Sequence, residues 1–233
     1  MINVVSEKTG AAKRTALWSV AYKMIAQKIM TMEYGPGTHL EEKLLTRELE
    51  IGRTPIREAL FQLTSDLLVE SQPGKGFVVR PITFQEVKSV FEALEILELG
   101  VARLALRRAD EQRISMMEED NRRMTAAVAE RDVEGMVTAN SGFHASLADS
   151  SQNTYLVEGL SRVRCAADRL AFLSYGNEVP PHLSLEEHWA QVVDEHARII
   201  DCIRRQDEDG LMEVLLVHQK SFKDRLVEYL VSY

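Results

Sequence analysis

Residues 52–60 read GRTPIREAL, and this stretch has the features of a helix start. Thr54 can cap a helix with its hydroxyl oxygen, and Pro55 sacrifices no hydrogen bond in a first turn, because the first helical amides have no partner within the helix. The spacing predicts a helix with Arg53, Thr54 and Arg57 on its outer side. Apolar residues recur at helical spacing and define its buried face: Ile56, Ala59, Leu60 and Leu63.

The outer side of this helix bears groups suited to DNA. Arginine can donate hydrogen bonds to a guanine edge or to a phosphate, and the amides at a helix start attract phosphate. Taken alone, however, so short a string with its two arginines is at least as typical of an ordinary surface helix. The neighbouring sequence decides between these interpretations.

The segments on either side favour the DNA-binding interpretation. Residues 41–49, EEKLLTREL, form a second short amphipathic pattern, and only residues 50–53 separate the two, which is the spacing of a helix-turn-helix. Downstream, residues 68–72 and 77–80 have the character of strands around PGKG at 73–76, a turn whose glycines permit positive φ and which carries Lys75 at its tip. A further helix is expected over residues 17–32. Together these elements predict a winged helix.

Residues 18–82 resemble the DNA-binding domain of the GntR family of bacterial transcription regulators. The family's Pro-Gly turn, Leu-x-Glu segment, Arg-Thr-Pro-x-Arg-Glu-Ala-Leu helix and Gly-x-Gly wing occur here in that order. One departure is Gly52, since the family commonly has Ser or Thr there, which caps the helix and can touch a phosphate. The resemblance implies contacts with double-stranded DNA at Lys43, Arg53, Thr54, Arg57, Gly74, Lys75 and Gly76.

Composition sets limits on the whole chain. Its 233 residues, 45% of them hydrophobic, suffice for two domains with their own cores. No apolar run approaches the length of a membrane span and no export signal is evident, so we expect a cytoplasmic protein without membrane contact. Cys165 and Cys202 lack the close spacing of a zinc or redox motif, and we expect buried free thiols.

Charge divides unevenly along the sequence. Residues 1–80 carry 11 Lys and Arg against 9 Asp and Glu, whereas residues 81–233 carry 17 against 27, within a net charge of −8. A small positive excess on one module is compatible with DNA binding, and an acidic partner domain discourages attachment through the wrong surface.

Three segments are expected. Residues 1–14 are polar and aperiodic and are interpreted as a mobile tail, residues 15–82 as the winged helix, and residues 83–233 as an all-α domain. Capping boxes at Thr83–Glu86 and Ser184–Glu187 mark two of the helix starts. The helices of this bundle are predicted over residues 83–109, 111–130, 132–150, 153–175, 184–205 and 208–232. Their order resembles the FCD ligand-sensing domain of the FadR-like branch of the GntR family.

The histidines of the all-α domain are candidates for metal binding. Asn140 and His144 are four residues apart on one helix, and His196 and His218 each lie in an apolar helical pattern. A single histidine in such a pattern is more often a core residue than a ligand. The FCD motif, however, matches all four positions and implies a divalent metal with three imidazole nitrogens and one oxygen. Zn²⁺ fits this set best, with Ni²⁺ or Mn²⁺ as alternatives.

Several positions depart from or fall outside the family pattern. Most relatives have Asp where this chain has Asn140, whose amide oxygen is a weaker ligand. Many carry Arg in place of Leu94 as an anchor for an effector carboxylate. Arg164 could substitute as the effector anchor, although a solvent-facing arginine is an equally good interpretation. The remaining histidines are assigned surface or capping roles: His39, His182 and His188.

The sequence therefore predicts a homodimeric transcription regulator, most simply a repressor, that reads a palindromic operator. Its helical domain would sense a small metabolite, a carboxylate, beside the bound metal. One alternative is a metal-dependent hydrolase, for which the sequence offers no general base because Glu195 is expected to point to a different face from His196. Another is a regulator whose metal is purely structural.

Overall fold

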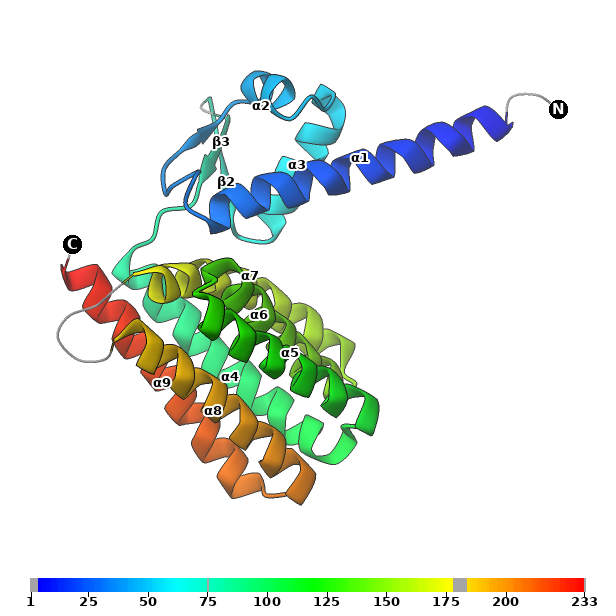
Figure 1. Ribbon diagram of the computed structural model, residues 1–233. Coiled ribbons are helices and arrows are strands. Elements are labelled where there is room, and N and C mark those ends of the chain that lie inside the picture. Colours follow the sequence, from blue (N-terminus) through cyan, green and yellow to red (C-terminus); the bar gives the residue numbers. More distant parts are fainter. Residues whose placement is uncertain (1–3, 75, 178–183, 233) are drawn as a thin grey trace. The chain divides into compact units, whose positions relative to one another are not determined.

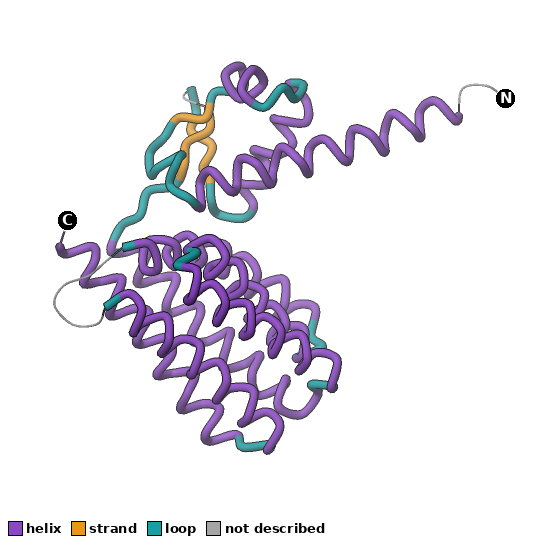
Figure 2. The backbone as a smooth tube through the Cα atoms, in the orientation of Figure 1, coloured by secondary structure: helices purple, strands orange, loops and turns teal. Residues whose placement is uncertain are grey.

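The computed structural model describes residues 4–74, 76–177 and 184–232. The chain divides into two units, Met1–Thr83 and Phe84–Tyr233, next to the boundary expected between residues 82 and 83. Figure 1 colours the elements along the sequence, and Figure 2 shows that the strands belong to the first unit. Among the described residues, none of the helices combines the length and apolar character needed to span a membrane.

The first unit is a winged helix. Its elements are α1 (Val4–Met30), β1 (His39–Leu40), α2 (Glu42–Glu48), α3 (Arg53–Ser65), β2 (Val69–Gln72) and β3 (Gly76–Val79). The strands pair antiparallel in the order β1-β3-β2. Helix α3 packs against α1 because both present fully buried aliphatic faces at helical spacing: Ala21, Ile25 and Ile29 on α1, and Ile56, Ala59, Leu60 and Leu63 on α3.

Three local predictions in this unit were wrong. Helix α1 begins at Val4, so residues 4–14 are helical rather than an irregular tail; this segment contains no proline, and its Ala, Lys, Arg and Glu residues favour helix. Strand β1 was missed because two residues are too short for a periodic signal. Helix α3 starts at Arg53 with Gly52 as its N-cap, so Thr54 does not cap it. Pro55 still lies in the first turn, where its missing amide costs nothing.

The second unit consists of helices throughout its described residues. They are α4 (Phe84–Arg108), α5 (Glu111–Glu130), α6 (Val133–Ser150), α7 (Thr154–Gly176), α8 (Leu185–Arg205) and α9 (Glu208–Ser232), close to the predicted bounds. Helix α4 packs against α6, α7, α8 and α9. The side chains of Asp110, Asp132, Asn153 and Ser184 cap the starts of α5 to α8, and Ser184 forms the predicted capping box with Glu187.

Candidate DNA-binding surface and metal centre

The N-terminal end of α3 presents its two arginines to solvent. The Arg53 side chain is 76% exposed and that of Arg57 is 59% exposed. Glu42 on α2 lies between them, because its Oε2 accepts a hydrogen bond from Arg53 Nε at 2.7 Å and its Oε1 lies 3.5 Å from Arg57 Nε. Thr54 is exposed on the same turn, as is Lys43 on α2. The structure thus brings four of the predicted DNA-contacting residues to one end of the helix-turn-helix.

An aromatic residue that the sequence analysis missed extends this surface. Phe61 is 52% exposed although it is large and apolar. Its ring packs edge-on against Phe77 of β3 at 5.4 Å between centroids, and the Arg57 guanidinium lies 5.9 Å from its centre. Helical spacing from Arg53 through Arg57 to Phe61 is the signal that could have identified it.

The turn between β2 and β3 has the backbone expected of the wing. Gly74 and Gly76 are exposed and have φ of 75° and 79°. Residues with a Cβ atom rarely adopt such backbone angles. Lys75, predicted to lie at the tip, is outside the described residues.

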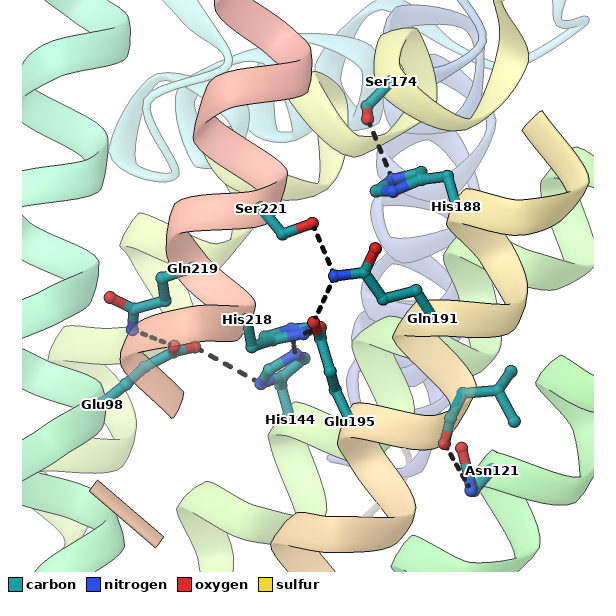
Figure 3. Close-up of polar contacts among 11 residues, drawn as sticks. Glu98, Asn121, His144, Ser174, His188, Gln191, Glu195, His218, Gln219 and Ser221 are labelled. Carbon is teal, nitrogen blue, oxygen red and sulfur yellow. Dashed lines mark hydrogen bonds and ion pairs between the residues drawn. The ribbon is translucent and has the colours of Figure 1, made fainter. Parts of the chain in front are cut away.

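Three of the four predicted metal ligands meet in the interior of the helical bundle. One nitrogen from each of His144, His196 and His218 lies within 4.8 Å of the others, and all three residues are buried. They come from α6, α8 and α9. Nε2 of His144 and Nε2 of His218 are 3.3 Å apart, which directs two imidazole edges at one point (Figure 3).

Two buried glutamates flank these imidazoles. Glu195 Oε2 lies 2.7 Å from His218 Nδ1, and Glu98 Oε1 lies 3.4 Å from His144 Nδ1 (Figure 3). The prediction that Glu195 points away from the cluster was therefore wrong. It is next to His196 in sequence, but it reaches the histidine of α9 across the interface of α8 and α9. Glu98 was missed altogether; it also accepts a hydrogen bond from Gln219 Nε2 at 2.5 Å.

Three further buried polar atoms, of His196 and of the predicted ligand Asn140, lack partners. Both ring nitrogens of His196 and the Oδ1 of Asn140 are buried, and none of these three atoms has a hydrogen-bond partner among the described residues. The His196 ring stacks on Phe143 with 3.8 Å between centroids. Burial lowers the pKa of His144 and of His196 well below the ordinary value, so these imidazoles are neutral and can act as ligands.

A cavity of about 260 Å³ lies beside the cluster, between α6 and α7. His144, Ser141, Arg164 and Asp168 contribute to its lining. Arg164 is not solvent-facing: its side chain is 12% exposed, and its Nη2 lies 2.8 Å from Glu98 Oε1. The solvent-facing interpretation of Arg164 is therefore wrong, whereas its role as an effector anchor stays a prediction.

The other histidines and the cysteines agree with the expectation only in part. His188 was assigned a surface or capping role, but it is 2% exposed, with its Nε2 3.5 Å from Ser174 Oγ. His188 lies on the buried apolar face of α8. A capping role was assigned to it because it directly follows the capping box at Ser184–Glu187. His39 is exposed, and His182 is outside the described residues. Cys165 and Cys202 are free, as predicted, but only half-buried.

Two family descriptions match the chain. The gntR family of bacterial regulatory proteins matches residues 17–79, and the FCD domain matches residues 89–221. The chain is 21% identical over 203 residues to the HTH-type transcriptional repressor RspR of Escherichia coli K12, which spans 87% of this chain and 86% of that protein. It is 27% identical over 205 residues to the Nta operon transcriptional regulator of Aminobacter aminovorans, covering 85% and 89% of the two chains. The solved structure of E. coli McbR/YncC shares the fold, with a TM-score of 0.77 at 18% identity over 93% of this chain and 99% of that one.

Proposed function

Because this chain belongs to the GntR family of bacterial regulatory proteins and carries an FCD domain, we propose that it is an effector-controlled transcriptional repressor. Two copies of the winged helix bind a palindromic operator. Affinity for the operator is set by a small carboxylate bound in the helical domain beside a divalent metal. The buried histidine cluster next to a cavity is the observation that carries the effector part of this proposal.

The start of α3 supports the DNA-binding part. Arg53 and Arg57 stand beside the helix N-terminus, where the free amides and the helix dipole favour a phosphate. Glu42 holds both guanidinium groups by their Nε atoms, which orders two flexible side chains before DNA arrives. An arginine fixed in this way can present its outer edge to a guanine in the major groove.

Sequencing DNA fragments retained by the purified protein tests this part. We expect fragments that share an inverted repeat. Its half-sites should lie about one helical turn apart, which is roughly ten base pairs. The Arg57→Ala variant is the matched control and should lose this enrichment. Enrichment that is the same for both proteins, or the absence of any shared sequence, would contradict the proposal.

The chemistry of the cluster supports a bound metal. The three imidazoles, of which those of His144 and His196 are neutral, offer nitrogen ligands, and the orphaned Asn140 Oδ1 offers an oxygen. This donor set suits Zn²⁺, with Ni²⁺ or Mn²⁺ as alternatives. Glu195 and Glu98 lie where carboxylates that orient metal-binding histidines lie, against the Nδ1 atoms of His218 and His144. A bound ion would supply a Lewis-acidic position for an effector oxygen. The residues therefore fit a metal.

Calorimetric titration of Zn²⁺ into chelator-treated protein tests the metal part. We expect one ion per chain in the wild type and a large loss of affinity in His196→Ala, whose imidazole has no other described polar partner. Operator binding is then measured with and without the metal. Equal operator affinity in both states, together with metal-dependent thermal stability, would instead assign the metal a structural role.

The hydrolase alternative is set aside. The family and the curated relatives are transcription regulators and not enzymes. Glu195 lies near the cluster, but it is engaged by His218 Nδ1 and by Gln191 Nε2 at 2.8 Å, which suits a residue that orients a ligand.

A further inference from the structure

We propose that the cavity beside the histidine cluster takes a short amino carboxylate, with its carboxylate at Arg164 and its ammonium group at Asp168. This inference rests on the proposed function, in which the cavity is the effector site, and it narrows the effector from an organic acid to a zwitterion. Both residues line the cavity and both stand on α7.

The positive charge of Arg164 is already offset by a carboxylate of the protein itself. Glu98 Oε1 lies 2.8 Å from its Nη2, and the Glu98 side chain is only 2% exposed. A simple anion that entered the cavity would thus approach an arginine whose charge is offset by a buried carboxylate. Attraction between the anion and Arg164 would be opposed by repulsion from Glu98 and Asp168, in an interior that screens charges poorly.

Asp168 has an unmet requirement that a cation would satisfy. Its Oδ1 is buried and has no hydrogen-bond partner among the described residues, and its carboxyl group otherwise interacts with Ser141. Burial raises the pKa of this carboxyl group, while the nearby Arg164 opposes the shift. An ammonium group donates to three acceptors and carries the opposite charge, so it matches this oxygen.

A bound metal ion would not make the cavity favour a simple anion. A divalent ion and Arg164 would together bring three formal positive charges, and the carboxylates of Glu98, Glu195 and Asp168 would offset them with three formal negative charges. The sequence had suggested an ion surrounded only by neutral groups. With both glutamates present, a ligand of zero net charge suits the cavity better than an anion.

Arg164 and Asp168 are near enough for one short ligand to reach both. They are four residues apart on a helix, so their Cβ atoms lie about 5–6 Å apart on one face of α7. A short chain with an ammonium group at one end and a carboxylate at the other can pair with both side chains. β-Alanine and γ-aminobutyrate are therefore suitable probes.

Matched pairs of ligands test the inference on the full-length, Zn²⁺-loaded protein. Calorimetric titration compares β-alanine with propionate and γ-aminobutyrate with butyrate, which differ only in the amino group. We expect at least one amino acid to bind about tenfold more tightly or better than its partner, as expected for a charged hydrogen bond. If neither amino acid binds more tightly than its partner, the proposal is wrong.

Two variants locate the ammonium group. Asp168→Asn should remove the preference for the amino acid, and it should strengthen binding of the plain carboxylate because it removes a repelling charge. Asp149→Asn, a change of the same kind at an exposed residue that lines the same cavity, should preserve the preference. Loss of the preference in Asp149→Asn alone would overturn the assignment to Asp168. Equal binding of propionate and β-alanine would keep a carboxylate effector site and overturn only the zwitterion, and operator binding on the same preparation tests the regulator independently.

Discussion

Arg57 is the residue whose removal tests the recognition surface most directly. Its guanidinium group lies between Glu42 and the ring of Phe61, so the side chain is oriented while 59% of it remains exposed. We expect Arg57→Ala to weaken operator binding by about 1–3 kcal/mol and to reduce discrimination among bases, as for the loss of a paired base contact.

Fluorescence anisotropy with the selected operator and with a scrambled duplex measures both effects of the Arg57 substitution. Arg122→Ala is the control, because Arg122 is an exposed arginine of α5 in the other unit. An Arg57→Ala protein that is folded and binds its operator like the wild type would remove α3 from the recognition surface.

His188 makes stability sensitive to acid. Burial and the charges of Arg225 and His218 lower its pKa to about 3, from an ordinary value near 6.5. The unfolded chain therefore binds a proton below about pH 6.5 that the folded chain refuses, so stability is full above that pH and falls as the pH drops toward 3. From pH 6.5 to 5.5 this group should cost about 1 kcal/mol.

Urea unfolding of the metal-free protein at these two pH values checks the role of His188. His188→Gln should lose less stability on acidification than the wild type, whereas His39→Gln, at an exposed position, should lose as much as the wild type. The same loss in all three proteins would show that other groups control the acid response.

Asn140 is the fourth candidate ligand, and an anionic replacement tests it. Asn140→Asp should bind Zn²⁺ more tightly, because a carboxylate is a stronger ligand than an amide oxygen. It should also weaken binding of the effector's carboxylate by adding negative charge next to Ser141, which lines the cavity. Calorimetric titration measures both affinities.

Asn153→Asp is the matched control for the Asn140 substitution. It adds the same charge at the N-cap of α7, where Asp caps as well as Asn, and should leave metal affinity unchanged. Equal metal affinity in Asn140→Asp and wild type would show that residue 140 is not a ligand.

The polar residues around the histidines show where inference from sequence reached its limit. His144, His196 and His218 were predicted because a family motif fixes their spacing. Glu98 and Glu195 were not, since an acid in an amphipathic helix is usually solvated and their partners lie on other helices. Both, however, fall on buried stripes of α4 and α8, and an acid on such a stripe is a signal that the sequence contains.

At the scale of elements, the helices of the bundle were predictable because capping residues next to the helix starts mark where most of them begin. Asp110, Asp132, Asn153 and Ser184 each bond a backbone amide at the third position of the following helix. The start of α3 was predicted less well because it lacks such a group. Gly52 caps α3 without a side chain.

The capping box of α8 gives the test at this scale. Ser184 Oγ accepts from the Glu187 amide at 3.2 Å, and Glu187 Oε2 accepts from the Ser184 amide at 3.0 Å. Ser184→Ala should therefore destabilise the protein by about 1 kcal/mol. Thr138→Ala, at an exposed position inside α6, is the control and should be neutral within about 0.5 kcal/mol. Chemical denaturation measures both; equal stability of the Ser184 variant and wild type would contradict the role of the cap.

For the whole molecule, the chain divides into two units because each unit buries its own apolar helix faces. The winged helix closes its core between α1 and α3, and the bundle closes its own around α4. The sequence predicted this division because the hydrophobic pattern changes character after the wing. A palindromic operator requires two copies of the first unit held at a fixed spacing, and a small winged helix offers little surface for that purpose.

Separate expression of the two units tests which one holds the proposed dimer together. Residues 84–233 should remain helical and dimeric, because they contain their own core and capping residues, and residues 1–83 should be folded and monomeric. Analytical ultracentrifugation at micromolar concentration, with circular dichroism as the check on folding, measures both. The isolated winged helix should then bind a half-site weakly and gain little from the second half-site, whereas the full chain gains from both through linkage. A monomeric but folded 84–233 would place the dimer contacts in the first unit, and an effector in the bundle could then no longer act by changing the spacing of two recognition helices.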